Sequence, residues 1–285
     1  MPNRADAHIH LFRNGYPASF TARPGVTIEE IPVYESLMAD HGVQAALVVA
    51  FEGMGDCAGN TAYLAEVVAS HDWLHPTAYF SVVDVPDVAG LERLSDSGFI
   101  GISLYIFDDE NAAALQAVDD AVWQWIIDHR WLISVNSRGE FWYAWRPVLE
   151  RYGDLRVVAS HLGLPPTATE PMDAEGADVA LASVRQLALY PGPQVKLSGF
   201  YAMTDPGYDY PHTQAWPYVE SLLRAFGAGR LLWASDYMPA LGYLSFGQTY
   251  GLFAKMPFLG DEQRAAIEGE NLLGLLNEAR RGAPQ

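Results

Sequence analysis

The chain has 285 residues, of which 35 are acidic and 17 are basic, so its formal net charge is -18. Half of the residues are apolar and 18% are charged, which is typical of a folded globular protein and excludes wholesale disorder. The acidic excess opposes binding to the phosphate backbone of nucleic acids or to an anionic membrane surface. We therefore expect a small-molecule partner, and neither nucleic acid nor membrane.

The same sequence indicates the compartment. Its single cysteine, Cys57, excludes an intramolecular disulfide. The first residues lack the basic start and apolar stretch of a signal peptide. The longest clean apolar runs, such as residues 45–51, are too short to span a bilayer. These features predict a cytoplasmic protein.

Short apolar runs alternate with longer amphipathic segments along the whole chain. Most of the runs are nearly continuous in Val, Ile, Leu and Ala, as expected for parallel strands that are covered on both faces. Eight strands are predicted, at residues 5–11, 43–51, 77–83, 100–107, 132–136, 155–161, 194–200 and 231–236.

Helices are predicted between these strands. Asn60 is expected to cap a helix over 61–71, and further helices are expected over 115–129, 218–226 and 262–279. Eight strand–helix units with no linker between them predict one (β/α)8 TIM barrel, a single domain over 1–285. The competing fold is an open doubly wound sheet. That fold usually has a glycine-rich first turn, and no Gly-x-Gly-x-x-Gly follows the first strand.

Two connections stand out by length and composition. Residues 163–178 are rich in proline, and residues 201–216 carry several tyrosines and His212. In a barrel both would lie on the C-terminal face, where active-site loops are found. The alternative is that they are ordinary surface connections.

Three strand ends carry residues suited to chemistry. His8 and His10 alternate along the first strand, so both side chains are expected to point into the barrel. Paired imidazoles can hold a metal or polarise a carbonyl, although two structural histidines are the simpler reading. His161 ends the sixth strand, and Asp236 ends the eighth. Because an unpaired buried carboxylate is costly, and because strand eight adjoins strand one, we expect these groups to converge.

With these residues in place, the sequence resembles the amidohydrolase superfamily, in particular its amidohydrolase-related group of lactonases and decarboxylases, and its pattern is most like the lactonases. The matching segments are 8–10, 161–163, 195–199, 235–239 and the helical ending 269–276. The resemblance spans essentially the whole chain. It implies a (β/α)8 hydrolase or related lyase in which Asp236 is the acid/base group beside the histidines of the first strand.

The metal site implied by the resemblance departs from the pattern of the metal-using members. Those members usually add a histidine on strand five or a lysine on strand four, and this chain has neither. His8, His10 and Asp236 remain as ligands, with His161 and Asn136 as further candidates. Three such ligands plus water suit catalytic zinc, the divalent ion that this set of ligand types favours. Some lactonases that resemble this pattern work without metal, so both alternatives stay open.

Other polar side chains near the strand ends are candidates for holding a substrate. Lys196 lies in the middle of the seventh strand, where an apolar residue is expected. Its ammonium needs an anionic or hydroxyl-rich partner, either the substrate or Asp236, unless it forms a purely structural ion pair. Arg138 follows strand five and suits a carboxylate, and Arg13 is a weaker candidate of the same kind. Asn136 and the aromatic residues Tyr105 and Tyr201 complete the predicted substrate site.

These observations predict a hydrolase that opens a lactone of a sugar acid or dicarboxylate. Asp236 would be the general base, and His161 with the first-strand histidines would polarise the carbonyl, with or without zinc. The alternative on the same fold is a metal-dependent non-oxidative decarboxylase. A barrel that only binds a small molecule is a third possibility, which gives little reason for the converging His and Asp residues. A homo-oligomer is compatible with all three.

Overall fold

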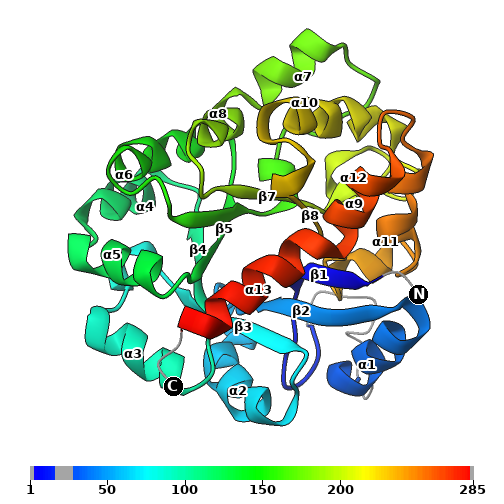
Figure 1. Ribbon diagram of the computed structural model, residues 1–285. Coiled ribbons are helices and arrows are strands. Elements are labelled where there is room, and N and C mark those ends of the chain that lie inside the picture. Colours follow the sequence, from blue (N-terminus) through cyan, green and yellow to red (C-terminus); the bar gives the residue numbers. More distant parts are fainter. Residues whose placement is uncertain (1–2, 17–27, 283–285) are drawn as a thin grey trace.

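The computed structural model describes residues 3–16 and 28–282. Eight parallel strands form one sheet in sequence order, and helices surround it (Figure 1). The predicted (β/α)8 TIM barrel is therefore confirmed. The strands are β1 Arg4–Ile9, β2 Val43–Val49, β3 Leu74–Phe80, β4 Gly101–Ile106, β5 Leu132–Ser137, β6 Arg156–Ala159, β7 Gln194–Leu197 and β8 Leu231–Trp233.

The barrel closes just beyond the end of β8. Ile9 and Tyr237 form a parallel bridge. The backbone N–H of Asp236 donates to the carbonyl of His8 at 3.0 Å, and the N–H of His10 donates to the carbonyl of Tyr237 at 2.7 Å. The residues singled out on the first and eighth strands are therefore hydrogen-bonded neighbours at the C-terminal end of the barrel.

The helices pack around the strands, and several lie where sequence periodicity predicts them. Short 3-10 turns lengthen many of the connections. The α-helices are α1 Glu30–His41, α2 Asn60–Val67, α3 Val88–Asp96, α4 Asp109–Ala114, α5 Asp120–Asp128, α6 Arg146–Arg151, α7 Ala174–Ala180, α8 Ala182–Arg185, α9 Phe200–Met203, α10 Trp216–Phe226, α11 Gln248–Gly251, α12 Asp261–Ala265 and α13 Asn271–Gly282.

Several local predictions are wrong in detail. The sixth and eighth strands end at Ala159 and Trp233, so His161 and Asp236, which were predicted to end them, lie in the turns that follow. The third strand begins at Leu74, three residues before the predicted start. The helix predicted over 115–129 is broken, because Asp119 caps a new helix by accepting from the N–H of Ala121. Asn60 is not a cap. Its side chain donates to the carbonyl of Leu11 at 2.7 Å and accepts from the N–H of Phe51, so it joins the ends of two strands.

The helix α13 closes the N-terminal end of the barrel, across which it runs in Figure 1. Leu272 and Leu276 of this helix pack against Ala5 and Leu47 from inside the barrel. Asn271 fixes the start of the helix by donating to the carbonyls at Ala228 and Leu231 at 2.8 and 2.9 Å. Because α13 covers the N-terminal end of the barrel, only the C-terminal end is left open for a site.

The two long connections lie side by side at that C-terminal end. Ala168, from the segment after β6, forms a parallel bridge with Thr204, from the segment after β7. Backbone hydrogen bonds from Ala168 to Met203 and from Asp205 to Ala168 hold them together. Among the described residues, no helix is both long and apolar enough to cross a membrane.

The packing of α13 and the turn before it predicts that replacing glycine by alanine changes the free energy of unfolding at one position and not at another. A Cβ on the buried Gly269 would overlap the carbonyl oxygen of Asn3 and lie 2.9 Å from the Cα of Arg4. Gly269→Ala should therefore lower the free energy of unfolding by about 1–3 kcal/mol in urea titrations. Gly274 is exposed on α13 with nothing within 4 Å of its Cβ position, so Gly274→Ala should be neutral or stabilising. Equal effects of the two changes would contradict this account of the docking.

Candidate active site

An irregularity in β1 turns His8 into the barrel. The pairing of β1 with β2 shifts register between Asp6 and Ile9, so the alternation of side chains is broken there. Ala7 belongs to the core around α13, and His8 nevertheless also faces the interior. The buried carboxylate of Asp6 holds this geometry by accepting from the N–H of His8 at 3.2 Å and of Ser235 at 2.8 Å.

Burial changes the pKa of the Asp6 carboxyl. It raises the pKa of this carboxyl to about 6, although hydrogen bonds from Ser235, His8 and Tyr34 act in the opposite direction. The hydroxyl of Tyr34 on α1 donates to the second carboxylate oxygen at 3.0 Å. Asp6 was not among the predicted site residues, and its only sequence signal is an acidic residue inside a buried strand.

The hydrogen bond between His10 and a backbone carbonyl fixes which ring nitrogens of His8 and His10 carry hydrogen. The carbonyl of Val49 can only accept, so Nδ1 of His10, 2.7 Å away, carries a hydrogen. In the neutral ring Nε2 of His10 is then an acceptor. Nε2 of His8 lies 3.0 Å from it and must be the donor. Nδ1 of His8 is therefore an acceptor.

Lys196 supplies a donor for that acceptor. It lies on β7 with no exposed surface. Its ammonium nitrogen is 3.0 Å from Nδ1 of His8 and donates to the hydroxyls of Ser134 at 2.6 Å and Ser160 at 3.3 Å. Burial lowers the pKa of Lys196 to about 7, while the charges of Asp236 and Asp6 act to raise it. The partner expected for this lysine was the substrate or Asp236, and its hydrogen-bond partners are instead His8 and the hydroxyls of Ser134 and Ser160.

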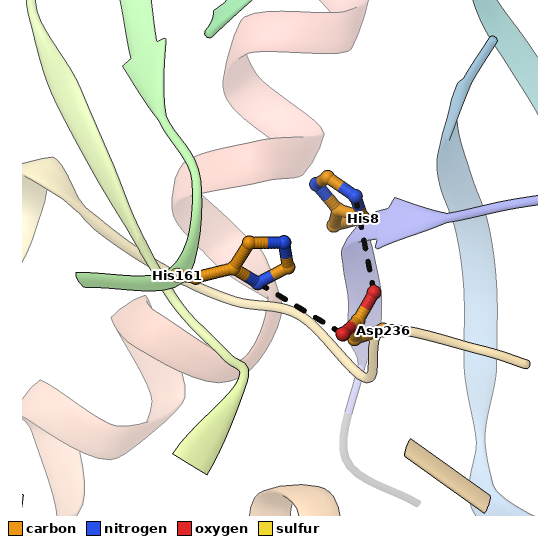
Figure 2. A group of neighbouring side chains, drawn as sticks. All are labelled: His8, His161 and Asp236. Carbon is orange, nitrogen blue, oxygen red and sulfur yellow. Dashed lines mark ion pairs between the residues drawn. The ribbon is translucent and has the colours of Figure 1, made fainter. Parts of the chain in front are cut away.

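Asp236 faces two histidines across the mouth of the barrel (Figure 2). One carboxylate oxygen is 3.9 Å from Nε2 of His8, and the other is 4.0 Å from Nδ1 of His161. The hydroxyl of Tyr201 donates to this second oxygen at 2.7 Å. The residue adopts a φ of 57°, a sparsely populated conformation for a residue other than glycine. The carboxylate is buried yet has a donor and two imidazoles around it.

His161 lies in a tight turn directly after β6. It has a φ of 53°, and Leu162 and Gly163 have values of 55° and 82°. Its Nδ1 lies 2.9 Å from the hydroxyl of Ser198, which follows β7. Three serines of this network, Ser134, Ser160 and Ser198, were not predicted. Their signal in the sequence is a small hydroxyl inside or at the end of an apolar strand.

Burial keeps all three imidazoles neutral at pH 7. It lowers the pKa of His10 to about 4, against an opposing effect of Asp236. It lowers the pKa of His8 well below its usual value, with Lys196 acting in the same direction. It also lowers the pKa of His161. Neutral rings can donate one hydrogen bond and accept another, or bind a metal through the free nitrogen.

The geometry provides a possible metal site. Ligand atoms of His8, His161 and Asp236 all lie within 4.8 Å of one another, which makes these three side chains candidate ligands of one ion. This trio shares His8 and Asp236 with the predicted set, in which His10 was the third ligand. His10 lies beside it, with its Nε2 3.0 Å from that of His8. The side-chain oxygen of Asn136 is also buried, without a hydrogen-bond partner among the described residues.

The predicted substrate-binding residues are distributed around this centre. Tyr105 and Asn136 are paired neighbours on β4 and β5, and the Tyr105 ring lies 4.9 Å from that of Phe51. Arg138 is exposed just beyond β5 and lies over the ring of Phe107 at 5.8 Å. Arg13 instead pairs with Glu66 on the surface, so its expected role in anchoring a carboxylate is not supported.

Comparisons with known proteins give the same family. The chain is 30% identical over 299 residues to an L-fucono-1,5-lactonase from Burkholderia ambifaria, and the match covers 95% of this chain and 94% of that protein. Solved structures share the fold at lower identity. An amidohydrolase from Burkholderia multivorans with bound zinc has a TM-score of 0.75 at 18% identity, covering 96% of this chain and 99% of the other.

A second structure is similar over the same extent. A probable 2-pyrone-4,6-dicarboxylic acid hydrolase from Acinetobacter baumannii, with citric acid bound, has a TM-score of 0.72 at 18% identity and covers 96% and 99% of the two chains. The family model described as amidohydrolase matches residues 5–272. That match contains all eight strands except the first residue of β1, together with every residue of the converging site. The chain is a hydrolase that belongs to the amidohydrolase family.

Proposed function

We propose that the protein hydrolyses a lactone by attack of water on the ring carbonyl. The observation that carries this proposal is the buried carboxylate of Asp236, which lies 3.9 Å from His8 and 4.0 Å from His161 at the open end of the barrel. A base and two neutral imidazoles on one centre match what ester hydrolysis requires. The similarity to a lactonase supports the same reaction.

In the proposed reaction Asp236 takes a proton from water as the water oxygen bonds to the carbonyl carbon. The tetrahedral intermediate then expels the ring oxygen, and Asp236 returns the proton to that leaving oxygen. Tyr201 orients the carboxylate through its 2.7 Å hydrogen bond. This bond leaves the other carboxylate oxygen, which faces His8, to accept from the water.

The negative charge that develops on the carbonyl oxygen needs donors or a cation. His161 is neutral, so a ring N–H of His161 can stabilise this oxygen. The N–H of neutral His8 can join it only by giving up its hydrogen bond to Nε2 of His10. A zinc ion held by His8, His161 and Asp236 would polarise the same carbonyl as a Lewis acid. The assignment of His161 as a catalytic residue follows from its place opposite His8 across Asp236.

We infer a sugar-acid lactone in preference to a dicarboxylate. Of the three cations that the sequence marks for this mouth, Lys196 is fully buried and Arg13 is paired with Glu66. Arg138 alone among these three is exposed and, among the described residues, in no ion pair. A dicarboxylate would need two anchors. The rings of Tyr105 and Phe51 instead suit the apolar face of a sugar ring, and Asn136 suits its hydroxyls.

A metal-dependent decarboxylase remains the alternative on this fold. It requires a bound divalent ion, whereas the proposed hydrolysis can use imidazole N–H donors. Release of carbon dioxide from an aromatic or aliphatic acid, lost on chelation, would favour this alternative. Ring opening that persists with a chelator would exclude it.

The central prediction concerns Asp236. The protein should open sugar-acid 1,5-lactones in a pH-indicator assay, run with and without added zinc, and Asp236→Asn should lower kcat by about 10²- to 10⁴-fold because the general base is lost. Asp205→Asn is the control, since Asp205 is exposed on the neighbouring loop. Full activity of Asp236→Asn, with native thermal stability in both variants, would refute the assignment.

A second prediction tests whether the hydrogen bond from Tyr201 orients the general base, Asp236. Tyr201→Phe removes the hydrogen bond to Asp236 and should lower kcat roughly tenfold, equal to about 1.4 kcal/mol of barrier. Tyr243 stacks on Tyr201 with ring centres 4.8 Å apart and is 53% exposed. Tyr243→Phe keeps the stack and should leave kcat unchanged. An equal loss in both variants would show that packing, and not the hydroxyl, supports the reaction.

A further inference from the structure

Trp142 is hydrogen-bonded to the turn that carries His161, although the two residues belong to different connections of the barrel. It lies in the 3-10 segment Gly139–Trp145, which follows β5, and it has no exposed surface. Its indole N–H donates to the backbone carbonyl of Gly163 at 2.8 Å. Because the indole is fully buried, Trp142 does not contact a substrate in the mouth, and it can influence the reaction only through this turn.

The turn keeps an unusual backbone conformation over four successive residues. The φ angles of His161, Leu162, Gly163 and Leu164 are 53°, 55°, 82° and 53°. Three of these residues are not glycine, and L residues persist in this left-handed region only where the surrounding structure holds them there. Two backbone hydrogen bonds close the turn locally, from Gly163 to the carbonyl of Ser160 and from Leu164 to that of His161.

Close packing and one hydrogen bond supply the surrounding support. A Cβ on Gly163 would overlap a methyl group of Val184 on α8, and a Cβ on Gly199 would lie 3.0 Å from both Cβ and Nδ1 of His161. The carbonyl of the buried Gly163 accepts from Trp142, and no other donor to it is recorded among the described residues. The indole N–H therefore satisfies a buried acceptor in the middle of the strained turn.

The other buried tryptophans show that burial alone does not give an indole such a partner. Trp123, Trp145 and Trp233 also have no or almost no exposed surface, and within the described part of the chain their indole nitrogens have no hydrogen-bond partner. Trp145 even belongs to the same 3-10 segment as Trp142. The bond to Gly163 is thus specific to position 142, and Trp145 provides a matched control.

We infer that Trp142 is a positioning residue whose indole N–H holds the left-handed turn after β6, and so keeps the His161 ring 4.0 Å from the carboxylate of Asp236 (Figure 2). Without the N–H a buried carbonyl loses its partner, and the strained turn gains by rearranging. The His161 ring then leaves its place opposite Asp236. The effect on catalysis rests on the proposed hydrolysis, whereas the position of the ring can be measured without it.

A double-mutant cycle on lactone opening by the full-length protein tests the effect on catalysis. Trp142→Phe should lower kcat roughly tenfold, because a small displacement of a catalytic group is costly. Trp145→Phe removes a similar volume and an unpartnered N–H, and it should leave kcat almost unchanged. In a His161→Asn background Trp142→Phe should have little further effect, since the residue through which it acts is absent. A tenfold loss that persists in this background contradicts the inference.

Crystal structures of the two tryptophan variants test the position of the ring independently of activity. In Trp142→Phe the distance from Nδ1 of His161 to the Asp236 carboxylate should exceed the present 4.0 Å, and in Trp145→Phe it should not change. An unmoved His161 in Trp142→Phe overturns the inference. A wild-type protein that opens no lactone refutes the proposed hydrolysis alone, and the two structures still decide the role of Trp142.

An isosteric replacement decides the matter if Trp142→Phe does not fold. Benzothienylalanine at position 142 keeps the shape of tryptophan and has sulfur in place of the indole N–H, so it removes the hydrogen bond without opening a cavity. The same loss of kcat and the same displacement of His161 are expected. Wild-type kcat together with an unmoved His161 in this protein would show that packing, and not the hydrogen bond, supports the turn, and would overturn the inference.

Discussion

The candidate site depends on one buried carboxylate that joins the first strand of the barrel to the end of the last. Asp6 accepts from the backbone N–H groups of His8 and Ser235. His8 is itself one of the chemical groups of the mouth, and Ser235 directly precedes another, Asp236. Without this acceptor two buried N–H groups would lose their partner at the barrel seam, which costs about 1–3 kcal/mol for each. The same bonds place Asp236 opposite His8, so closing the barrel and assembling the site are one event.

A different group lies against each of the three imidazoles. The carbonyl of Val49 fixes His10, the hydroxyl of Ser198 contacts His161, and Lys196 lies against His8. The protein carries a formal charge of -18, yet its mouth holds neutral rings, a buried lysine and one carboxylate. The global charge opposes the approach of polyanionic partners but not that of a substrate with an ester carbonyl and hydroxyls.

Much of this arrangement could be predicted from the sequence, because apolar strands ending in polar residues identify both the barrel and its chemical end. His161 and Asp236 were found in this way. Asp6 and the bulge beside it could not be, since strict alternation assigns Ala7 and His8 to opposite faces and only pairing with β2 reveals the shift. Lys196 was identified as unusual, but its position behind His8 depends on the relative register of β7 and β1, which no local pattern contains.

The central claim is that the substrate carbonyl lies between Asp236, His8 and His161. The most direct test is a crystal structure of the Asp236→Asn variant soaked with a sugar-acid lactone that the wild-type enzyme opens. We predict an intact lactone whose carbonyl oxygen is within hydrogen-bond distance of the His8 or His161 ring and whose carbonyl carbon faces position 236. A lactone bound with its carbonyl directed away from these three residues would contradict the account.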